Sequence, residues 1–300
     1  MSRPSRTRRA KVGVVGLGNM GRGIALNLAK SLRSVAVWDV SPAARARFAA
    51  IKGVSIATPG EMARDCAVIF FVVPGSTEIA QCLNGRHGVL ANARRGLVLY
   101  DLTSSDPART RKLAKRAAAK GIAYLDAGMS GGATGADAGT LTLMIGGDRA
   151  SYSSTRRYLR PIAENTFFLG PSGAGHTLKL VHNMVCHAVF LATCEGGRMA
   201  ERAGIRLADT IEVFNVSNAR SYASQVRFPR HILSRKWDAR SRIYNLRKDV
   251  KMAVAMGRRL GVNPAIGAAA LGYLERAAGM GMLDEDFSLL YRDFEKIGRK

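Results

Sequence analysis

Lys179 and Asn183 are the side chains with the clearest chemical potential in this chain. They stand four positions apart in a segment without proline, so a helix would place them on one face, with His182 beside them. A lysine that faces a cleft next to a charged dinucleotide can have a lowered pKa and exchange a proton with an alcohol. An amide one turn away can hold that lysine or a substrate hydroxyl. The same spacing is also typical of a solvated surface pair.

A second segment, Asp126–Ala136, reads DAGMSGGATGA and follows a strand-like run. Gly131 and Gly132 leave backbone N–H groups exposed beside the Ser130 hydroxyl, which makes an anion-binding concavity suited to a carboxylate. A plain glycine-rich loop is the alternative interpretation.

A third segment, residues 16–21, reads GLGNMG and lies between a predicted strand and a predicted helix. Gly16 permits the tight turn, Gly18 lets the backbone approach a pyrophosphate, and Gly21 lets the helix pack on the strand. The helix N-terminus then offers unpaired N–H groups to the phosphates. We therefore predict a dinucleotide site formed by Gly16, Leu17, Gly18, Asn19, Met20 and Gly21.

Asp39 ends the next predicted strand, 18 residues after Gly21. A carboxylate at that place accepts hydrogen bonds from the adenosine ribose and repels a 2′-phosphate. The sequence thus favours NAD, whereas Arg45 and Arg47 keep NADP open. An ordinary acid at a strand end is the alternative for Asp39.

These residues need a sheet and a long helix to position them. Apolar, strand-like runs alternate with helical segments, which indicates a parallel sheet covered on both faces. The expected strands are 11–15, 34–38, 67–73, 96–100, 122–125, 140–146 and 166–169. Helices are expected from Ser41-Pro42 to about Ala50, over 107–120, and then over 176–203, 211–216, 226–233, 247–260 and 265–278.

The predicted fold is an α/β Rossmann-type dinucleotide-binding domain followed by a long interdomain helix and an all-α C-terminal domain. Residues 1–10 are expected to form a basic flexible tail. Residues 11–171 are expected to form the NAD(P)-binding domain, and residues 172–300 the all-α substrate and oligomerisation domain, with the linking helix over about 176–203.

Composition narrows the class of protein further. Of the 300 residues, 47% are hydrophobic and 23% are charged, which excludes disorder as the main state. Four scattered cysteines form no C-x-x-C pair, and no uninterrupted apolar run is long enough to span a bilayer. We expect a reduced, cytoplasmic protein without a metal site and without a membrane partner.

The charge balance is unusual, since 46 Lys and Arg against 22 Asp and Glu give a net charge of +24. Such a field attracts anions, including nucleic acid, acidic lipid and carboxylate metabolites. The basic residues are dispersed outside the run Ser2–Lys11 and no nucleic-acid motif accompanies them. We therefore expect a solvated basic surface and no nucleic-acid partner.

The ordered segments 16–21, 126–147, 173–183 and 246–249 together resemble the β-hydroxyacid dehydrogenase family, in particular 3-hydroxyisobutyrate dehydrogenase-like members. The resemblance covers essentially the whole chain beyond the tail. It implies a Rossmann domain, a long helix and an all-α domain that usually dimerises, often within a tetramer. A small anionic hydroxy acid or its semialdehyde is the implied substrate.

The resemblance also implies roles for individual residues. Lys179 resembles the general acid/base and Asn183 its partner in orienting the substrate. The other residues with implied roles are the carboxylate loop Ser130, Gly131 and Gly132, the substrate contacts Lys248 and Asp249, of which Lys248 also contacts the cofactor, and the nicotinamide-side residues Val73, Pro74 and Ser104. Arg220 is a candidate anion anchor, for which a helix-surface arginine is the alternative.

The chain departs from the family pattern at two places. Gly128 stands at the third position of the loop, as in the 6-phosphogluconate dehydrogenase branch, but Cys186 stands where that branch has its catalytic glutamate. We therefore predict an NAD(P)-dependent oxidoreductase that interconverts a small β-hydroxy acid and its semialdehyde. Oxidative decarboxylation of 6-phosphogluconate type is the enzymatic alternative, and a nucleic-acid-associated protein with a vestigial dehydrogenase fold is the alternative from another class.

Overall fold

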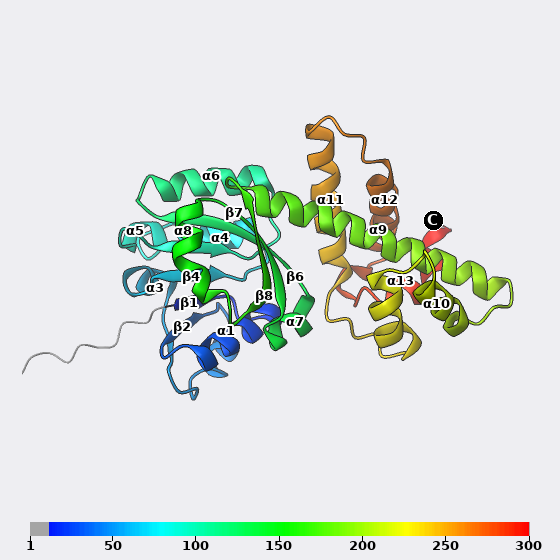
Figure 1. Ribbon diagram of the computed structural model, residues 1–300, viewed down its shortest axis with the longest axis horizontal. Coiled ribbons are helices and arrows are strands. Elements are labelled where there is room, and N and C mark those ends of the chain that lie inside the picture. Colours follow the sequence, from blue (N-terminus) through cyan, green and yellow to red (C-terminus); the bar gives the residue numbers. More distant parts are fainter. Residues whose placement is uncertain (1–11, 300) are drawn as a thin grey trace, which may run out of the picture. The chain divides into compact units, whose positions relative to one another are not determined.

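The computed structural model describes residues 12–299, so the predicted basic tail lies outside the described residues. The chain divides into two compact units with a boundary between Lys179 and Leu180 (Figure 1). The first unit holds the sheet and the second is helical, which confirms the predicted class of fold. The boundary falls within the long helix, and the predicted domain limits at 171 and 172 stay a prediction.

One eight-stranded sheet forms the first unit, in the order β3-β2-β1-β4-β5-β6-β7-β8. Its strands are β1 (Val12–Val15), β2 (Val35–Trp38), β3 (Val54–Ile56), β4 (Val68–Phe71), β5 (Val98–Asp101), β6 (Ala123–Ser130), β7 (Leu141–Gly146) and β8 (Ala163–Gly170). The fully apolar runs predicted as strands form β1, β4 and the start of β5, because both faces of the sheet are covered.

The sheet is mixed rather than wholly parallel. Strands β1 to β6 pair in parallel, but β7 runs antiparallel to β6 and β8 is parallel to β7. Only residues 131–140 connect β6 to β7, and they hold the seven-residue helix α7 (Gly132–Ala138). A parallel crossover needs a dozen or more residues, so this short connection returns the chain in the opposite direction.

Helices cover both faces of the sheet, where they enclose two separate apolar clusters. Besides α7 they are α1 (Asn19–Ser31), α2 (Pro42–Ala46), α3 (Pro59–Asp65), α4 (Ser76–Leu83), α5 (Val89–Asn92), α6 (Pro107–Ala118) and α8 (Arg149–Thr155), with a 3₁₀ turn over Arg156–Tyr158.

The prediction that the helix after Ser41 reaches Ala50 is wrong, because α2 ends at Ala46 and turns follow. These turns bury Phe48 in the core, where it is 2% exposed.

The long helix α9 (Ala174–Arg202) lies within two residues of the range predicted for it at each end. The second unit continues with α10 (Leu207–Val216), a π-helix (Ala223–Leu233), α11 (Ile243–Arg259), α12 (Ala265–Gly279), a 3₁₀ turn (Met282–Asp284), α13 (Leu289–Arg292) and α14 (Phe294–Gly298). Pro229 lies inside the π-helix and has no N–H for the backbone ladder, which agrees with the irregular winding there.

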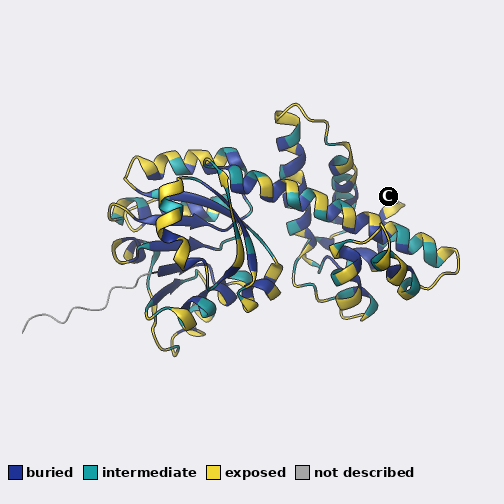
Figure 2. Ribbon diagram, viewed as in Figure 1, coloured by how far each residue is buried: buried dark blue, intermediate teal, exposed yellow. Residues whose placement is uncertain are grey.

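Each unit has its own buried interior. The strands and the inward faces of the helices are buried, whereas the outer helix faces are exposed (Figure 2). Among the described residues, α9 is the one helix long and apolar enough to cross a membrane by length and composition. Of its most apolar window, 44% is buried in the structure, and buried core helices meet the same criteria. This feature is therefore weak evidence for a membrane span.

Candidate active site

The carboxyl ends of five strands gather the predicted cofactor residues of the first unit at one edge of the sheet. Strands β1, β2, β4, β5 and β6 are parallel, so the segments that follow them lie at the same edge. These segments contain the glycine turn 16–21, Asp39, the pair Val73-Pro74, Ser104 and the loop 130–132. In open α/β sheets this edge is where ligands bind.

The glycine turn has the geometry that a dinucleotide requires. Gly16 has a φ of +96°, and a Cβ there would lie 2.2 Å from the carbonyl oxygen of Val72. A Cβ on Gly21 would lie 1.9 Å from the carbonyl oxygen of Gly16, so only glycine lets α1 start this close to the turn. A Cβ on Gly18 would meet no atom within 4 Å, which leaves open space over the first turn of α1, where a pyrophosphate fits.

Asp39 is held against the glycine turn by its own carboxylate. Its Oδ2 accepts a hydrogen bond from Leu17 N (2.7 Å), and its Oδ1 accepts one from Ser41 N (2.8 Å). The Arg45 guanidinium lies 4.5 Å above the Trp38 ring and donates to the main-chain oxygen of Asp39 (2.6 Å). The Asp39 carboxylate at the end of β2 therefore accepts hydrogen bonds from two backbone N–H groups, and the Arg45 guanidinium contacts the main chain of the same residue.

Lys179 lies in the first unit, one to two turns into α9, and is 8% exposed. A Cβ placed on Gly128 of β6 would lie 2.4 Å from the Lys179 Cβ, so α9 packs onto the strand at this glycine. The glycine at the third position of the loop is thus the residue that admits the lysine. Two residues further along the same strand, Ser130 begins the predicted carboxylate loop.

The loop itself has a backbone that favours glycine. Gly131 and Gly132 have φ values of +120° and +60°, and both are exposed. The N–H groups of the first turn of α7 have no partner within that helix by geometry, while Gly135 N bonds to Gly131 O (3.0 Å). Lys179 of α9 therefore packs on β6 at Gly128, two residues before Ser130 of this loop.

In the second unit, the structure joins Asn183 to the Lys-Asp pair of α11. Asn183 Nδ2 donates to Asp249 Oδ2 (2.6 Å), and Lys248 Nζ lies 3.4 Å from Asp249 Oδ1. The His182 Nδ1 and the Asn183 Oδ1 are 3.0 Å apart. With Asn183 and Asp249 only 7% and 5% exposed, both ends of the amide are fixed in a buried setting.

Arg220 is not joined to these residues. It is exposed in the turn after α10, where its backbone N donates to Ser217 O (3.1 Å) and its side chain has no partner among the described residues.

Cys186 lies two turns after Lys179, at the position where the 6-phosphogluconate branch has its glutamate. It contacts Arg227, whose Nη2 donates to the thiol sulfur (3.3 Å). That arginine lies over the rings of Phe190 and Phe287.

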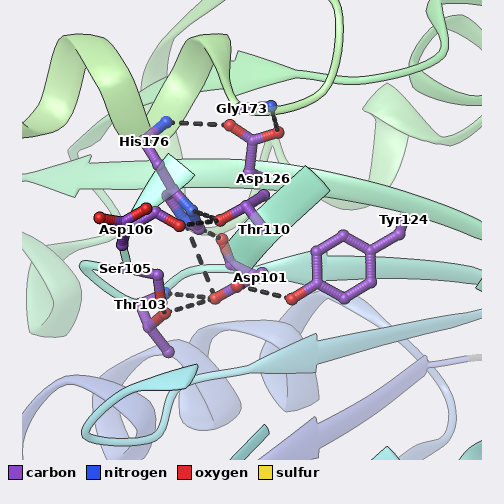
Figure 3. A network of polar contacts seen from close by, with 9 residues as sticks. All are labelled: Asp101, Thr103, Ser105, Asp106, Thr110, Tyr124, Asp126, Gly173 and His176. Atoms are coloured by element: carbon purple, nitrogen blue, oxygen red, sulfur yellow. Dashed lines mark hydrogen bonds and ion pairs between the residues drawn. The ribbon is translucent and has the colours of Figure 1, made fainter. Parts of the chain in front are cut away.

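A buried polar network in the first unit was not predicted from the sequence (Figure 3). Asp101 at the end of β5, Asp126 of β6 and His176 of α9 are each 0% exposed. Asp101 and Asp126 are direct partners in the β5–β6 register. One signal in the sequence could have indicated this network. Asp101 and Asp126 each stand in a mostly apolar strand, and a carboxylate that is buried in a sheet needs hydrogen-bond partners.

Family comparisons agree with this architecture over both units. Residues 11–170 match the family described as the NAD binding domain of 6-phosphogluconate dehydrogenase. Residues 173–294 match the family described as NAD-binding of NADP-dependent 3-hydroxyisobutyrate dehydrogenase. Among the residues 12–299, no group of three or more His, Cys, Asp or Glu side chains is arranged to hold a metal ion.

Individual relatives cover nearly the full chain. The chain is 31% identical over 287 residues to 2-(hydroxymethyl)glutarate dehydrogenase of Eubacterium barkeri, with 96% of this chain and 95% of that protein covered. It is 31% identical over 288 residues to a probable mitochondrial 3-hydroxyisobutyrate dehydrogenase of Dictyostelium discoideum, with 93% and 89% covered. The solved structure of Mycobacterium tuberculosis 3-hydroxyisobutyrate dehydrogenase with L-serine superposes with a TM-score of 0.85 at 26% identity, covering 95% of this chain and 99% of that chain.

A Rossmann-like sheet with a glycine turn at its carboxyl edge, followed by a long helix and a helical unit, defines a dinucleotide-binding oxidoreductase. The chain belongs to the 3-hydroxyisobutyrate dehydrogenase-like β-hydroxyacid dehydrogenase family. It is therefore an NAD(P)-dependent dehydrogenase that acts on the CH–OH group of its donors.

Proposed function

We propose that this enzyme interconverts a small β-hydroxy acid and its semialdehyde, with Lys179 as the general acid/base. The observation that carries the proposal is the packing of Lys179 on β6 at Gly128, directly before the loop that begins at Ser130. A bound dinucleotide would supply the hydride acceptor, or the donor in reduction. The glycine turn at the same sheet edge fits such a group.

The carboxylate of the substrate would bind at the loop Ser130–Gly132. Backbone N–H groups and the Ser130 hydroxyl offer donors there, and the positive φ of both glycines turns the backbone toward an anion. This anchor would leave the hydroxyl-bearing carbon to face Lys179. A neutral lysine amine would remove the hydroxyl proton as hydride leaves the same carbon, and in reduction the ammonium would return it.

Asn183 would orient the reacting hydroxyl. The support is its fixed amide, which contacts both Asp249 and His182 in the second unit. Lys248 stands beside that carboxylate and is proposed to contact both substrate and cofactor. These are the residues that the family resemblance also implies.

NAD is the proposed cofactor. The support is the Asp39 carboxylate at the end of β2, which is held by Leu17 N and would accept hydrogen bonds from an adenosine ribose and repel a 2′-phosphate. Of the two competing cations, Arg45 is engaged with the Trp38 ring and two main-chain oxygens, and Arg47 is exposed just after α2.

A homodimer or homotetramer is the proposed assembly. Leu178, Val181, Val185 and Val189 form an apolar stripe along α9, with exposed fractions between 38% and 54%. Contiguous exposed apolar surface of this kind marks an interaction site.

The experiment is a panel of substrates followed at 340 nm with NAD and NADP. The oxidation arm contains 3-hydroxyisobutyrate, 2-(hydroxymethyl)glutarate, L-serine, glycerate, threonate and 6-phosphogluconate. The reduction arm contains glyoxylate and succinic semialdehyde. Turnover of a β-hydroxy acid without CO₂ release supports the proposal. Release of CO₂ from 6-phosphogluconate would favour the decarboxylating alternative, and silence with every compound would count against a small hydroxy acid.

A further inference from the structure

We infer that Asp126, linked to Asp101 through His176, is a positioning residue that fixes Lys179 relative to the nicotinamide-side loop. The inference rests on the proposed role of Lys179. It concerns contacts within the first unit, and Figure 3 draws the hydrogen bonds that join Asp126, His176 and Asp101 to their partners.

Asp126 caps the helix that carries the lysine, although it lies on a strand, 47 residues before Gly173. Its Oδ1 accepts a hydrogen bond from Gly173 N (2.7 Å), and its Oδ2 accepts one from His176 N (2.9 Å). Gly173 precedes α9 and has no side chain with which to cap it. The strand carboxylate therefore satisfies two N–H groups that α9 would otherwise leave unpaired.

The cap also fixes where α9 meets the sheet. A Cβ on Gly175 would lie 2.2 Å from Met144 O and 3.0 Å from Asp126 Oδ2, so the first turn of the helix touches β6 and β7 directly. Lys179 stands three residues after His176, which is about 4.5 Å along the helix axis. Any rotation or fraying of this first turn would move the lysine.

His176 carries the connection to the next strand. Its Nδ1 lies 2.7 Å from the Thr110 hydroxyl, and its Nε2 lies 3.2 Å from the Asp101 carbonyl oxygen. The carbonyl oxygen can only accept a hydrogen bond, and the same is true of the Asp101 carboxylate, whose Oδ1 lies 3.8 Å from Nε2. His176 Nε2 is therefore the donor in its contact with Asp101. The ring therefore ties the first turn of α9 to the end of β5.

Asp101 in turn sets the loop after β5. Its Oδ1 accepts from Thr103 N (3.0 Å) and from the Thr103 hydroxyl (2.6 Å), and its Oδ2 accepts from Tyr124 OH (2.6 Å). Ser104, the predicted nicotinamide-side residue, follows directly. One buried network thus holds the helix of the proposed acid/base and the loop of the proposed cofactor contact in one arrangement.

The test compares Asp126→Asn with Asp148→Asn in the full chain. Asp148 is a matched control, since its Oδ2 accepts from Ser151 N (2.7 Å) at the start of α8. An asparagine amide accepts only through one oxygen, so Asp126→Asn loses one of its two cap bonds, whereas Asp148→Asn can keep its bond from Ser151 N. Asp126→Asn is expected to lower Tm more than Asp148→Asn. Only Asp126→Asn is expected to lower kcat, by about tenfold to a hundredfold, because a misplacement of about 1 Å at a reacting group costs that much.

Two readouts separate positioning from loss of folded protein. The KM for the dinucleotide is expected to stay within about twofold in Asp126→Asn, because the glycine turn is untouched. The primary deuterium isotope effect on kcat is expected to rise above that of the parent enzyme, since hydride transfer becomes slower than product release. A smaller folded fraction alone changes neither quantity.

If Asp126→Asn does not fold, Thr110→Val tests the same network more mildly. It removes the hydroxyl that contacts His176 Nδ1 (2.7 Å) and, at longer range, Asp106 O (3.2 Å), and the expected loss in kcat is about twofold to twelvefold, which corresponds to one hydrogen bond of ordinary net strength. A kcat and an isotope effect equal to those of the parent in the folded variant would overturn the inference. Lys179→Ala measured beside it keeps the two ideas apart, since a fully active Lys179→Ala would instead overturn the proposed function.

Discussion

The hydrogen bond between Asn183 and Asp249 offers the sharpest quantitative test of the second unit. Asn183 Nδ2 donates to Asp249 Oδ2 at 2.6 Å, and both residues are less than a tenth exposed. Replacement of Asp249 by alanine removes the carboxylate that accepts the hydrogen bond from Nδ2. The amide would then lose the contact that fixes its orientation, on which its proposed role toward the substrate hydroxyl depends.

The expected magnitude follows from the charge and burial of the pair. A hydrogen bond to a charged group contributes about 1.5–3 kcal/mol, and little solvent reaches this one to weaken it. If that energy is realised in the transition state, kcat/KM falls about tenfold to 150-fold in Asp249→Ala. Because Asp249 acts here through Asn183, Asn183→Ala should lose at least as much, and the double variant should lose no more than the worse single variant.

The assay is a double-mutant cycle on kcat/KM with the substrate that the panel identifies. A coupling energy of about 1.5–3 kcal/mol is predicted between the two positions. Glu275→Ala is the matched control, because this carboxylate also receives a close hydrogen bond, from Arg247 at 2.6 Å, but is 38% exposed. Independent losses that multiply in the double variant would refute the claim that Asp249 positions Asn183.

Three further outcomes are expected. Asp39→Ala should shift the ratio of kcat/KM for NADP over NAD upward by about tenfold or more, since a carboxylate no longer opposes a 2′-phosphate; an unchanged ratio would contradict the NAD assignment. Val185→Glu should lower the mass measured by light scattering, because it puts a charge into the exposed apolar stripe of α9; an unchanged mass would exclude that stripe as the interface. Burial raises the pKa of the Cys66 thiol to about 12, whereas an unfolded thiol titrates near 9. The native state therefore keeps a proton that the unfolded state releases, so Tm should fall as pH rises from 9 toward 12, and less steeply in Cys66→Ala; equal slopes would contradict this origin.

Local patterns were sufficient for most of the fold. The apolar runs that became β1 and β4 are buried on both faces, so their composition alone identifies them. The short connection between Ser130 and Leu141 could have predicted that β7 runs antiparallel to β6. The alternation of strand-like and helical segments favoured a parallel sheet instead. Helix α3 was missed even though Thr58 and Glu61 form a capping box around its start.

The site divides in the same way between local and distant contacts. Lys179 and Asn183 share one helix, so their spacing predicts that they lie on one face. The hydrogen bond from Asn183 to Asp249 spans 66 positions. The family resemblance implied a site role for each of these residues, but neither it nor the spacing predicted that they bond to each other. The contacts of His176 with Asp126 and Asp101 span 50 and 75 positions, and they exist only after β5, β6 and α9 have packed. No local pattern encodes such a network.

The most direct test of the central claim is the turnover of Lys179→Ala beside the parent enzyme, at saturating substrate and cofactor and with dinucleotide binding measured separately. Loss of a general acid/base is expected to lower kcat by about 10²–10⁴-fold while binding of the dinucleotide persists. A Lys179→Ala enzyme that binds the dinucleotide and turns over at the parent rate would show that another group moves the proton.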